Sequence, residues 1–403
     1  MTVEGSLRQL ASELAVSAHM SGLLTRISLR NEVLDVSLPI LGSTVGIRVE
    51  PLESQFAVGV VGFNPVAVRW IHDVLGFCTR LMVVSSEGRE IAYTALSVTE
   101  GDLMLETCRA IELTRRFRHQ EESGNYSPDT TVPMYWSSGL LNFGDWIGPH
   151  LIYGMTGRQP VLQNRVGLSP DRVLWSVGSI LGWFKSPNVD VWGSGLIRPL
   201  TQEEALAKRK LGAEVKIHAV RGVLTMEEVT SKIGWHVPEI IGDPGLLLPD
   251  IMPRAQHSSG RSVVVPHYIH RQRVESNPSA NGNVVDVRND VFTCASQISG
   301  ATAVVSSSLH GIVLAQAYEV PWVWLRVDDL PLTGVDFKFE DFFTCLDRAA
   351  VASVTVRESE LSTVSFQEVA KRATLPELKT DLDALRDALP VRPASRSVDT
   401  FWE

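Results

Sequence analysis

A histidine lies at the junction of a predicted strand and a predicted helix in VVSSSLHGIVLAQAYEVPW, residues 304–322. The β-branched run before it indicates a buried strand, and the apolar spacing after it indicates a helix. Ser307 and Ser308 therefore end the strand, and His310 stands at the helix start, followed by Gly311. We expect His310 to face a crevice and to titrate near neutrality, which suits a proton donor. The alternative is a structural histidine.

Another strand-to-helix turn, in SSGLLNFGDWIGPHLI, carries Asn142, Gly144 and Asp145. The glycine permits close approach of the backbone, and Asp145 could cap the helix N-terminus. In WGSGLIRP, Gly193 and Gly195 flank Ser194, which predicts bare backbone N–H groups at a helix start. Such groups suit a phosphate or a carboxylate. The alternatives are a plain helix cap in the first turn and a tight turn that needs glycine in the second.

Two further segments carry positive charge at strand ends. Arg221 ends an apolar strand in HAVRGVLTMEEV, where it could pair with a bound carboxylate or phosphate or form an internal salt bridge. VVVPHYIHRQR places His267, His270, Arg271 and Arg273 just after a strand. This cluster is either a solvated basic loop or a contact for an anion.

Nearly continuous apolar strands that alternate with helices must position these turns. The strands fall into two groups, TVPMYW, RVLWSVGS, VDVWGSG and EVKIHAV before the Pro- and Gly-containing segment 242–260, and RSVVVPHY, NVVDVR and ATAVVSSS after it. This pattern is typical of parallel sheets covered on both faces, so the predicted class is α/β with two Rossmann-like lobes that face each other. Ligands in such folds bind beyond the carboxyl ends of the strands.

The predicted domain boundaries follow these groups. An N-terminal α+β unit of unassigned role covers residues 1–125, the first lobe 131–250, the second lobe 258–350, and C-terminal helices and tail 351–403. Within the first 125 residues, EVLDVSLPI and VGIRVE alternate like half-buried strands, RLMVVSSEGREIAYTAL reads as a hairpin, and GDLMLETCRAIELTRRF reads as a helix.

Near the C-terminus, leucine spacing predicts an amphipathic helix that begins after Thr374 and has Pro376 in its first turn. The leucines are Leu378, Leu382, Leu385 and Leu389. We expect this helix to pack across the two lobes.

Composition restricts the possible functions. The net charge of −9 over 403 residues argues against bulk binding of nucleic acid. The cysteines lie far apart without a CxxC pair, so zinc and redox motifs are absent. The N-terminal sequence does not read as a signal peptide, and no apolar run approaches the ~18 residues of a membrane span. We expect a cytoplasmic protein with no metal ligands and no cofactor.

The ordered motifs NFGDWIGP, WGSG, VRG, GDPGLLLP, VVVPHY and SSSLHGIVLAQAYEVPWV resemble those of the polysaccharide pyruvyl transferase family. Within it the similarity is to bacterial exopolysaccharide (succinoglycan-type) ketal pyruvyl transferases, over about residues 132–350, with FKFEDF near the end. The resemblance implies a fold like that of GT-B glycosyltransferases. It also implies transfer of pyruvate from phosphoenolpyruvate to two hydroxyls of a sugar, with release of phosphate.

Carried over by motif, the resemblance makes His310 the general acid, Arg221 a ligand of the donor's carboxylate or phosphate, and Asp145 a base or acceptor contact. Some family members carry Arg-Leu-His where this chain has Ser308-Leu309-His310. The missing charge would then come from the loop with Arg271 and Arg273, or from Lys338.

The remaining predicted contacts bind the substrates, phosphoenolpyruvate and a sugar or lipid-linked oligosaccharide. These residues are Asn142, Gly144, Gly193, Ser194, Gly195, His267, Arg271, Ser307, Ser308, Leu309, Gly311 and Lys338. A lipid-linked acceptor would bring the protein to the inner face of the membrane.

Two other functions remain open. One is a nucleotide-sugar glycosyltransferase on the same two-lobed fold, although no glutamate pair of the kind that holds a ribose follows PHY or SLHG. The other is a catalytically silent sugar-binding member, which the serine at position 308 favours and the presence of Asn142, Asp145, Arg221 and His310 disfavours.

Overall fold

The structure is a computed structural model of the chain. It describes residues 5–11, 26–30, 32–40, 43–52, 55–62, 82–86, 89–98, 131–137, 142–162, 172–255, 260–280, 282–287, 291–334 and 336–393. The chain divides into two compact units, Met1–Pro128 and Asp129–Glu403.

The N-terminal unit contains an antiparallel sheet in the order β1-β2-β3-β4-β6-β5. Its strands are β1 Arg26–Arg30, β2 Val33–Ile40, β3 Ser43–Leu52, β4 Gln55–Gly62, β5 Met82–Ser86 and β6 Arg89–Val98. Alternate residues such as Leu34, Val36, Ile47 and Val49 are buried, which is the period of a sheet with one covered face. Ser86 pairs with Arg89, as the predicted hairpin requires. The helix predicted over 101–117 lies outside the described residues.

The first lobe is built on a parallel sheet in the order β11-β10-β9-β7-β8. Its strands are β7 Thr131–Tyr135, β8 Gln159–Leu162, β9 Val173–Trp175, β10 Val189–Ser194 and β11 Val215–Val220. Its α-helices in the described residues are α4 Phe143–Thr156, α5 Gln202–Arg209 and α6 Val223–Glu228. The four strands predicted for this lobe are present, and β8 was not predicted.

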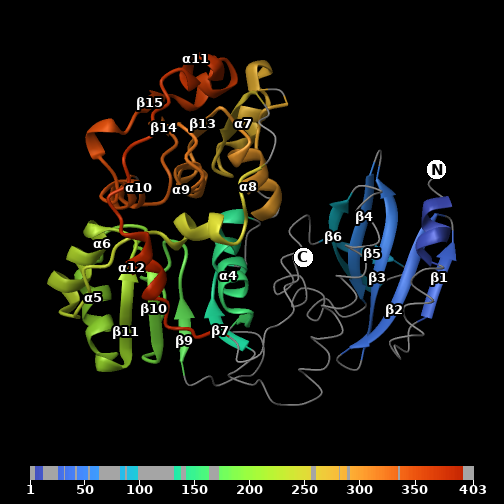
Figure 1. Ribbon diagram of the computed structural model, residues 1–403, viewed down its shortest axis with the longest axis horizontal. Coiled ribbons are helices and arrows are strands. Elements are labelled where there is room, and N and C mark those ends of the chain that lie inside the picture. Colours follow the sequence, from blue (N-terminus) through green and yellow to red (C-terminus); the bar gives the residue numbers. More distant parts are fainter. Residues whose placement is uncertain are drawn as a thin grey trace. The chain divides into compact units, whose positions relative to one another are not determined.

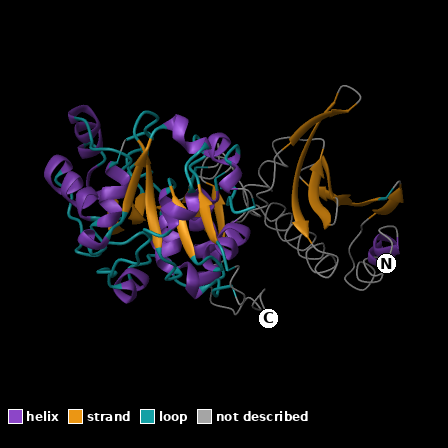
Figure 2. Cartoon of the chain, turned by 90° about the horizontal axis from the view of Figure 1, so that it is seen from above, coloured by secondary structure: helices purple, strands orange, loops and turns teal. Residues whose placement is uncertain are grey.

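The second lobe is built on a parallel sheet in the order β12-β13-β14-β15. Its strands are β12 Ser262–Val265, β13 Ala303–Ser306, β14 Trp322–Val327 and β15 Ser353–Val356. Its helices are α7 Arg271–Glu275, α8 Val291–Ser299, α9 Leu309–Ala317, α10 Phe337–Phe343 and α11 Phe366–Ala370. Helices flank the strands of this α/β unit in Figures 1 and 2, as they do in Rossmann-like lobes.

The strand predicted at NVVDVR, residues 283–288, is wrong. The described residues of this segment make only an isolated bridge, between Val284 and Val264 of β12. The strand that pairs along the whole of β12 is β13. Instead the last two strands of the sheet, β14 and β15, come from segments that were not predicted as strands. Their assignment depends on pairing partners far away in the sequence, which local propensity does not encode.

The segment between the lobes is part of the core. It forms a short helix, η4 Pro244–Asp250, in which Leu246, Leu247 and Leu248 are buried. A Cβ on Gly245 would lie 3.0 Å from Val313 of α9 and 3.8 Å from Ile147 of α4, so η4 packs between a helix of each lobe.

The C-terminal helix, α12 Leu382–Asp387, begins later than predicted. Residues before it run extended along the second lobe, where Thr374 and Leu378 bridge to Trp322 and Leu346, and this pairing prevents a helix after Thr374. The helix then lies on the first lobe, since the Trp192 indole donates to the Leu385 carbonyl at 2.8 Å. The prediction that this helix packs across both lobes is therefore met by the C-terminal segment as a whole, because its extended part lies on the second lobe while α12 contacts the first lobe and η4.

Candidate active site

The N-terminus of α4 belongs to the first lobe and is capped by Asn142. Its Oδ1 accepts from the Gly144 N–H at 3.4 Å, and its Nδ2 donates to Asp145 Oδ2 at 3.2 Å. Asn142 is therefore the cap, and the expectation that Asp145 caps this helix is wrong. Burial raises the pKa of Asp145 to about 7, although the Asn142 hydrogen bond and Lys338 act in the opposite direction.

His310 lies in the first turn of α9, in the second lobe, against α4. A Cβ on Gly144 would lie 1.9 Å from His310 Nδ1, and the rings of Phe143 and His310 meet edge to face with centroids 6.4 Å apart. The histidine is only 8% exposed, and its Nε2 has no hydrogen-bond partner among the described residues. Burial, together with Lys338 and Arg221, lowers the pKa of His310 to about 3. The expectations of an exposed ring and of titration near neutrality are wrong for the protein without ligand.

Lys338 of α10 is the cation that connects these groups. Burial first, and then Arg221, lower the pKa of Lys338 to about 8, while Asp145 raises it. Its ammonium lies 5.5 Å from the Phe339 ring centroid and has no ion pair within the described part of the chain. Lys338 also lowers the pKa values of His310 and His267. We call Asp145, His267, His310 and Lys338 the interlobe cluster.

The loop after β12 is fixed by Ser307. The Ser307 hydroxyl accepts from the His267 N–H at 3.0 Å and lies 3.0 Å from His270 Nδ1. His270 Nε2 lies 3.0 Å from the Leu330 carbonyl, which can only accept, so Nε2 donates and Nδ1 accepts from Ser307. Ser307 thus orients the loop. Burial first, and then nearby positive groups, lower the pKa of His267 to about 3.

The WGSG turn is part of the scaffold. Gly193 has a φ of +74°, and a Cβ there would lie 2.3 Å from Pro244. The Ser194 hydroxyl and the Gly195 N–H both donate to the Gly178 carbonyl, at 3.1 and 3.0 Å. The next helix begins only at Gln202. The prediction of free N–H groups at a helix start is wrong for this turn.

Other predicted ligands also have partners within the protein. Arg271 pairs with Glu275 at 2.6 Å and Arg273 with Glu358 at 3.1 Å. A Cβ on Gly311 would lie 2.5 Å from the Ser306 hydroxyl, so this glycine lets α9 approach its own sheet. Leu309 is a buried core residue, and Ser308 is the N-cap position of α9 without a side-chain cap hydrogen bond.

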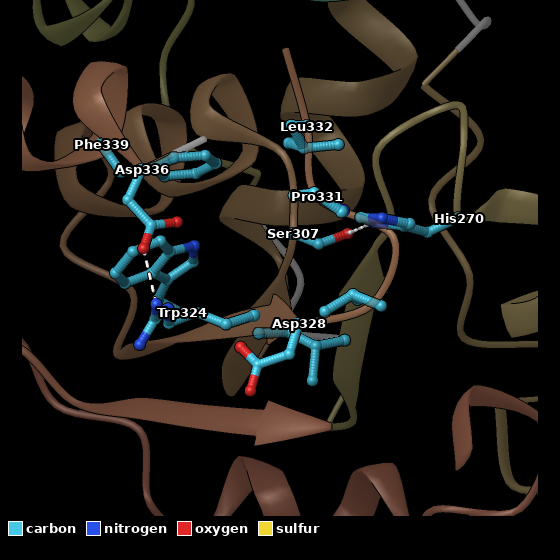
Figure 3. Close-up of a pocket in the computed structure, with 11 residues that line it drawn as sticks. His270, Ser307, Trp324, Asp328, Pro331, Leu332, Asp336 and Phe339 are labelled. Carbon is cyan, nitrogen blue, oxygen red and sulfur yellow. Dashed lines mark hydrogen bonds and ion pairs between the residues drawn. The ribbon is translucent and has the colours of Figure 1, made fainter. Parts of the chain in front are cut away.

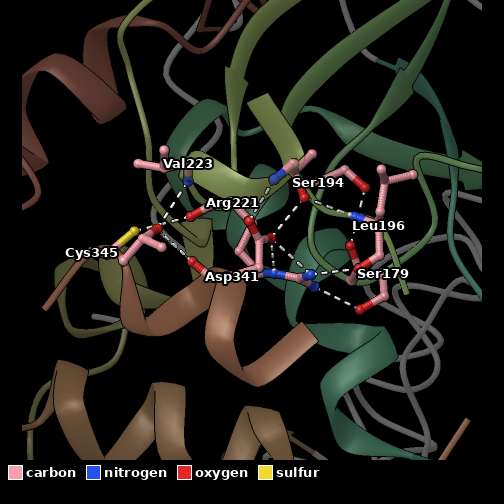
Figure 4. A network of polar contacts seen from close by, with 10 residues as sticks. Ser179, Ser194, Leu196, Arg221, Val223, Asp341 and Cys345 are labelled. Carbon is pink, nitrogen blue, oxygen red and sulfur yellow. Dashed lines mark hydrogen bonds and ion pairs between the residues drawn. The ribbon is translucent and has the colours of Figure 1, made fainter. Parts of the chain in front are cut away.

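Arg221 is fully buried and forms an ion pair with Asp341 of α10 at 2.9 Å (Figure 4). Of the two alternatives for Arg221, the internal salt bridge is therefore present. Sequence reasoning missed Asp341. A usable signal was its place within FKFEDFF, because Phe339, Phe342 and Phe343 are all buried around it.

A small pocket lies at the carboxyl end of the second sheet (Figure 3). It measures about 60 Å³ and its lining includes His270, Ser307, Trp324, Asp336 and Phe339. This volume holds a few water molecules and is too small for a sugar. In the part of the chain that the structure describes, no three His, Cys, Asp or Glu side chains gather as metal ligands. Among the same residues, no helix has the length and apolar character that a membrane crossing needs.

The fold and the cluster define an α/β protein with two parallel sheets and a mixed-charge site where α4, α9 and α10 meet. Residues 165–329 match the model of the polysaccharide pyruvyl transferase family, which confirms the resemblance over this segment. The match covers the strand-end turns with Arg221, His267 and His310, and it ends before Lys338.

Two curated proteins are similar to the chain. One is an uncharacterized protein of Acanthamoeba polyphaga mimivirus, 29% identical over 178 residues, which are 42% of this chain and 58% of the relative. The other is the succinoglycan biosynthesis protein ExoV of Rhizobium meliloti (strain 1021), 28% identical over 203 residues, which are 47% of this chain and 58% of ExoV. The alignments thus span little more than half of each relative. No solved structure matches the chain.

Gly144→Ala is expected to destabilise the protein, because its Cβ would overlap the His310 ring at 1.9 Å. Overpacking of this kind costs about 1–3 kcal/mol. Gly148→Ala, one turn later in α4, is the matched control, since its Cβ meets nothing closer than 3.6 Å. It should stabilise the helix by roughly 0.5–1 kcal/mol. Urea unfolding compares the two variants, and equal stabilities would contradict the close contact.

Asp145→Asn is expected to raise the melting temperature by a few degrees at about pH 8.5 and to leave it unchanged near pH 3.5. The folded-state pKa of Asp145, about 7, lies above its ordinary value of 3.8. The contribution of Asp145 to the free energy of unfolding is therefore fully present below its ordinary pKa of 3.8. It is lost as the pH rises through the folded-state pKa of about 7. Asparagine does not ionise and escapes this loss. Thermal melts across this pH range test the expectation, and a difference that does not grow with pH would refute it.

Proposed function

We propose that the chain is a pyruvyl transferase that moves pyruvate from phosphoenolpyruvate onto two hydroxyls of one sugar during synthesis of a cell-surface polysaccharide. The family match over residues 165–329 and the similarity to the succinoglycan biosynthesis protein ExoV support this proposal. The observation that carries it is Lys338, a half-buried lysine whose ammonium has no ion pair among the described residues. A cation that is partly removed from water and unpaired favours an anionic ligand, and phosphoenolpyruvate offers both a carboxylate and a phosphate.

In this proposal the two lobes face each other in a GT-B-like arrangement, with the donor bound between α4 and α10. The donor's anionic groups contact Lys338, and the N-terminus of α4 adds a positive field to the same place. Arg221 acts on this site only at a distance, through its electrostatic effect on His310 and Lys338, since its guanidinium is paired with Asp341.

His310 is the proposed general acid, although its pKa of about 3 leaves it neutral before the donor binds. A bound anion stabilises the imidazolium and raises this pKa, so the proton is taken up together with the donor. Asp145, with a pKa of about 7, is suited to accept a proton from the sugar hydroxyl.

In the proposed reaction, C3 of phosphoenolpyruvate gains a proton and C2 exchanges its bond to phosphate for bonds to two sugar hydroxyls. His310 gives a proton to C3 of the enol, which makes C2 electrophilic, and the first sugar hydroxyl forms a bond to C2 while Asp145 takes its proton. The C2–O bond to phosphate breaks, and the second hydroxyl closes the ketal. Of the two hydroxyl protons, one restores the acid and the other leaves with the phosphate. All reactants are cytoplasmic or lie at the inner face of the membrane.

The test is the release of phosphate from phosphoenolpyruvate, with p-nitrophenyl or lipid-linked hexosides as acceptors. We expect release that depends on the acceptor and a product heavier by the pyruvyl ketal. Release of a nucleoside diphosphate from a nucleotide sugar would instead establish the glycosyltransferase. Binding of the hexoside without turnover of either donor would indicate the silent sugar-binding protein.

A further inference from the structure

A buried ion pair joins the two lobes at the side of the interlobe cluster. Arg221 directly follows β11 in the first lobe, Asp341 lies in α10, and both side chains are 0% exposed. The Arg221 Nε donates to Asp341 Oδ2 at 2.9 Å. The rest of the guanidinium is held by the first lobe, where Nη1 donates to the Ser179 hydroxyl at 2.6 Å and Nη2 to the Leu196 carbonyl at 2.7 Å (Figure 4).

The Asp341 carboxylate receives further hydrogen bonds from the first lobe. The Thr225 N–H donates to Oδ1 at 2.8 Å, and the Thr225 hydroxyl donates to Oδ2 at 2.7 Å. One helical turn after Asp341, the Thr344 hydroxyl accepts a hydrogen bond from the Val223 N–H at 2.9 Å. A Cβ on Gly222 would lie 1.9 Å from the Asp341 carbonyl oxygen, so only glycine permits this approach. These contacts fix α10 against the start of α6.

A buried ion pair of this kind often stabilises a protein no more than well-packed apolar residues would. Removing two charges from water carries a desolvation penalty that the attraction between them often fails to exceed. What such a pair does supply is a single defined orientation of the helix that carries it. Lys338 lies three residues before Asp341 in α10, so the two side chains project from neighbouring positions on the same side of the helix. The rotation of α10 that satisfies Asp341 therefore also sets the direction of Lys338.

We propose that Asp341 is a positioning residue, whose ion pair with Arg221 holds α10 so that the Lys338 ammonium meets the anionic donor. The inference rests on the proposed function and deepens it, because it names the element that replaces the arginine absent at Ser308. Asp341 acts only through Lys338 and does not touch the donor.

A double-mutant cycle on the binding of phosphoenolpyruvate tests this role. Calorimetric affinities are compared for the wild type, Asp341→Asn, Lys338→Met and the double variant. We expect Asp341→Asn to weaken binding about tenfold, which corresponds to about 1.4 kcal/mol. In the Lys338→Met background the same substitution should change the affinity by less than about twofold, because the group through which it acts is gone. Glu340→Gln is the matched control, since Glu340 neighbours Asp341 in α10 but pairs with Arg348 at the surface, and it should leave the affinity unchanged.

An equal loss of affinity from Asp341→Asn in both backgrounds would overturn the proposal, and so would no loss in either. If Asp341→Asn does not fold, Thr344→Val replaces it in the cycle, because it removes the tie between Thr344 and Val223, together with the hydrogen bond from the Thr344 hydroxyl to the Asp341 carbonyl, and leaves the ion pair in place. The same dependence on Lys338, with a smaller loss, is then expected. Failure of the wild type to bind phosphoenolpyruvate would be a different result and would overturn the proposed function itself.

Discussion

His310→Gln is expected to reduce acceptor-dependent release of phosphate from phosphoenolpyruvate by about 10²–10⁴-fold, the range that general acid catalysis supplies. Glutamine keeps much of the side-chain volume against Phe143 and Gly144 but has no proton to give to carbon. His236→Gln is the control, because His236 is exposed, and it should keep full activity. Residual activity close to that of the wild type would exclude His310 as the acid.

A second measurement on the same variant tests how His310 acquires its proton. The pKa of His310 lies near 3 before the donor binds, and an adjacent anion raises it. Binding of phosphoenolpyruvate at neutral pH should therefore take up a proton and should weaken as the pH rises. Calorimetry in buffers of different ionisation enthalpy measures this uptake. We expect it to disappear in His310→Gln. If it persists there but disappears in Asp145→Asn, the proton belongs to Asp145 and the roles of acid and base are reversed.

Lys338→Met is expected to weaken binding of phosphoenolpyruvate by roughly 10–100-fold, as removal of a charged hydrogen-bond donor generally does. The same substitution should raise the melting temperature near neutral pH. The folded-state pKa of Lys338, about 8, lies below its ordinary value of 10.5, so folding disfavours the charged form. The contribution of Lys338 to stability is complete at high pH and is lost as the pH falls through about 8. Methionine keeps the apolar stem and carries no charge.

Lys379→Met is the matched control for this prediction. Lys379 is an exposed residue of the same unit, and its ammonium lies 3.9 Å from the Asp347 carboxylate. Its substitution should change neither donor binding nor the melting temperature. If Lys338→Met loses both affinity and stability, Lys338 is a structural cation rather than a ligand of the donor. Unchanged affinity of Lys338→Met for phosphoenolpyruvate would show that Lys338 does not bind the donor.

Much of the α/β core was predictable, because several of its buried strands are short, nearly continuous apolar runs bounded by turn residues. TVPMYW, VDVWGSG and ATAVVSSS are all strands, and their order along the chain separates the two sheets. The edge elements were less predictable. β15 is short and only partly buried, and its identity as a strand depends on pairing with β14. NVVDVR has the composition of a strand, but its described residues join the sheet only through the single bridge between Val284 and Val264.

The candidate site was likewise predictable only in part. The strand-end motifs placed His310 and Asp145 correctly at the first turns of α9 and α4. They could not show that Gly195 serves the scaffold, because its partner, the Gly178 carbonyl, becomes evident only in the folded chain. The pair of Arg271 with Glu275 has the i,i+4 spacing of a helix, which the local sequence could have indicated.

By itself, the sequence determined the strands, the turns that carry His310, Asp145 and Arg221, and the resemblance to the pyruvyl transferase family. The tertiary structure decided which of these groups are paired within the protein and at what pH they ionise. Arg221 and Asp341 are 120 residues apart in the chain, and only the packing of α10 against the first lobe joins them. Burial, which displaces the pKa values of Asp145, His310 and Lys338, likewise arises where the two lobes cover one another. Desolvation depends on what surrounds a side chain in space, and the order of residues does not record it.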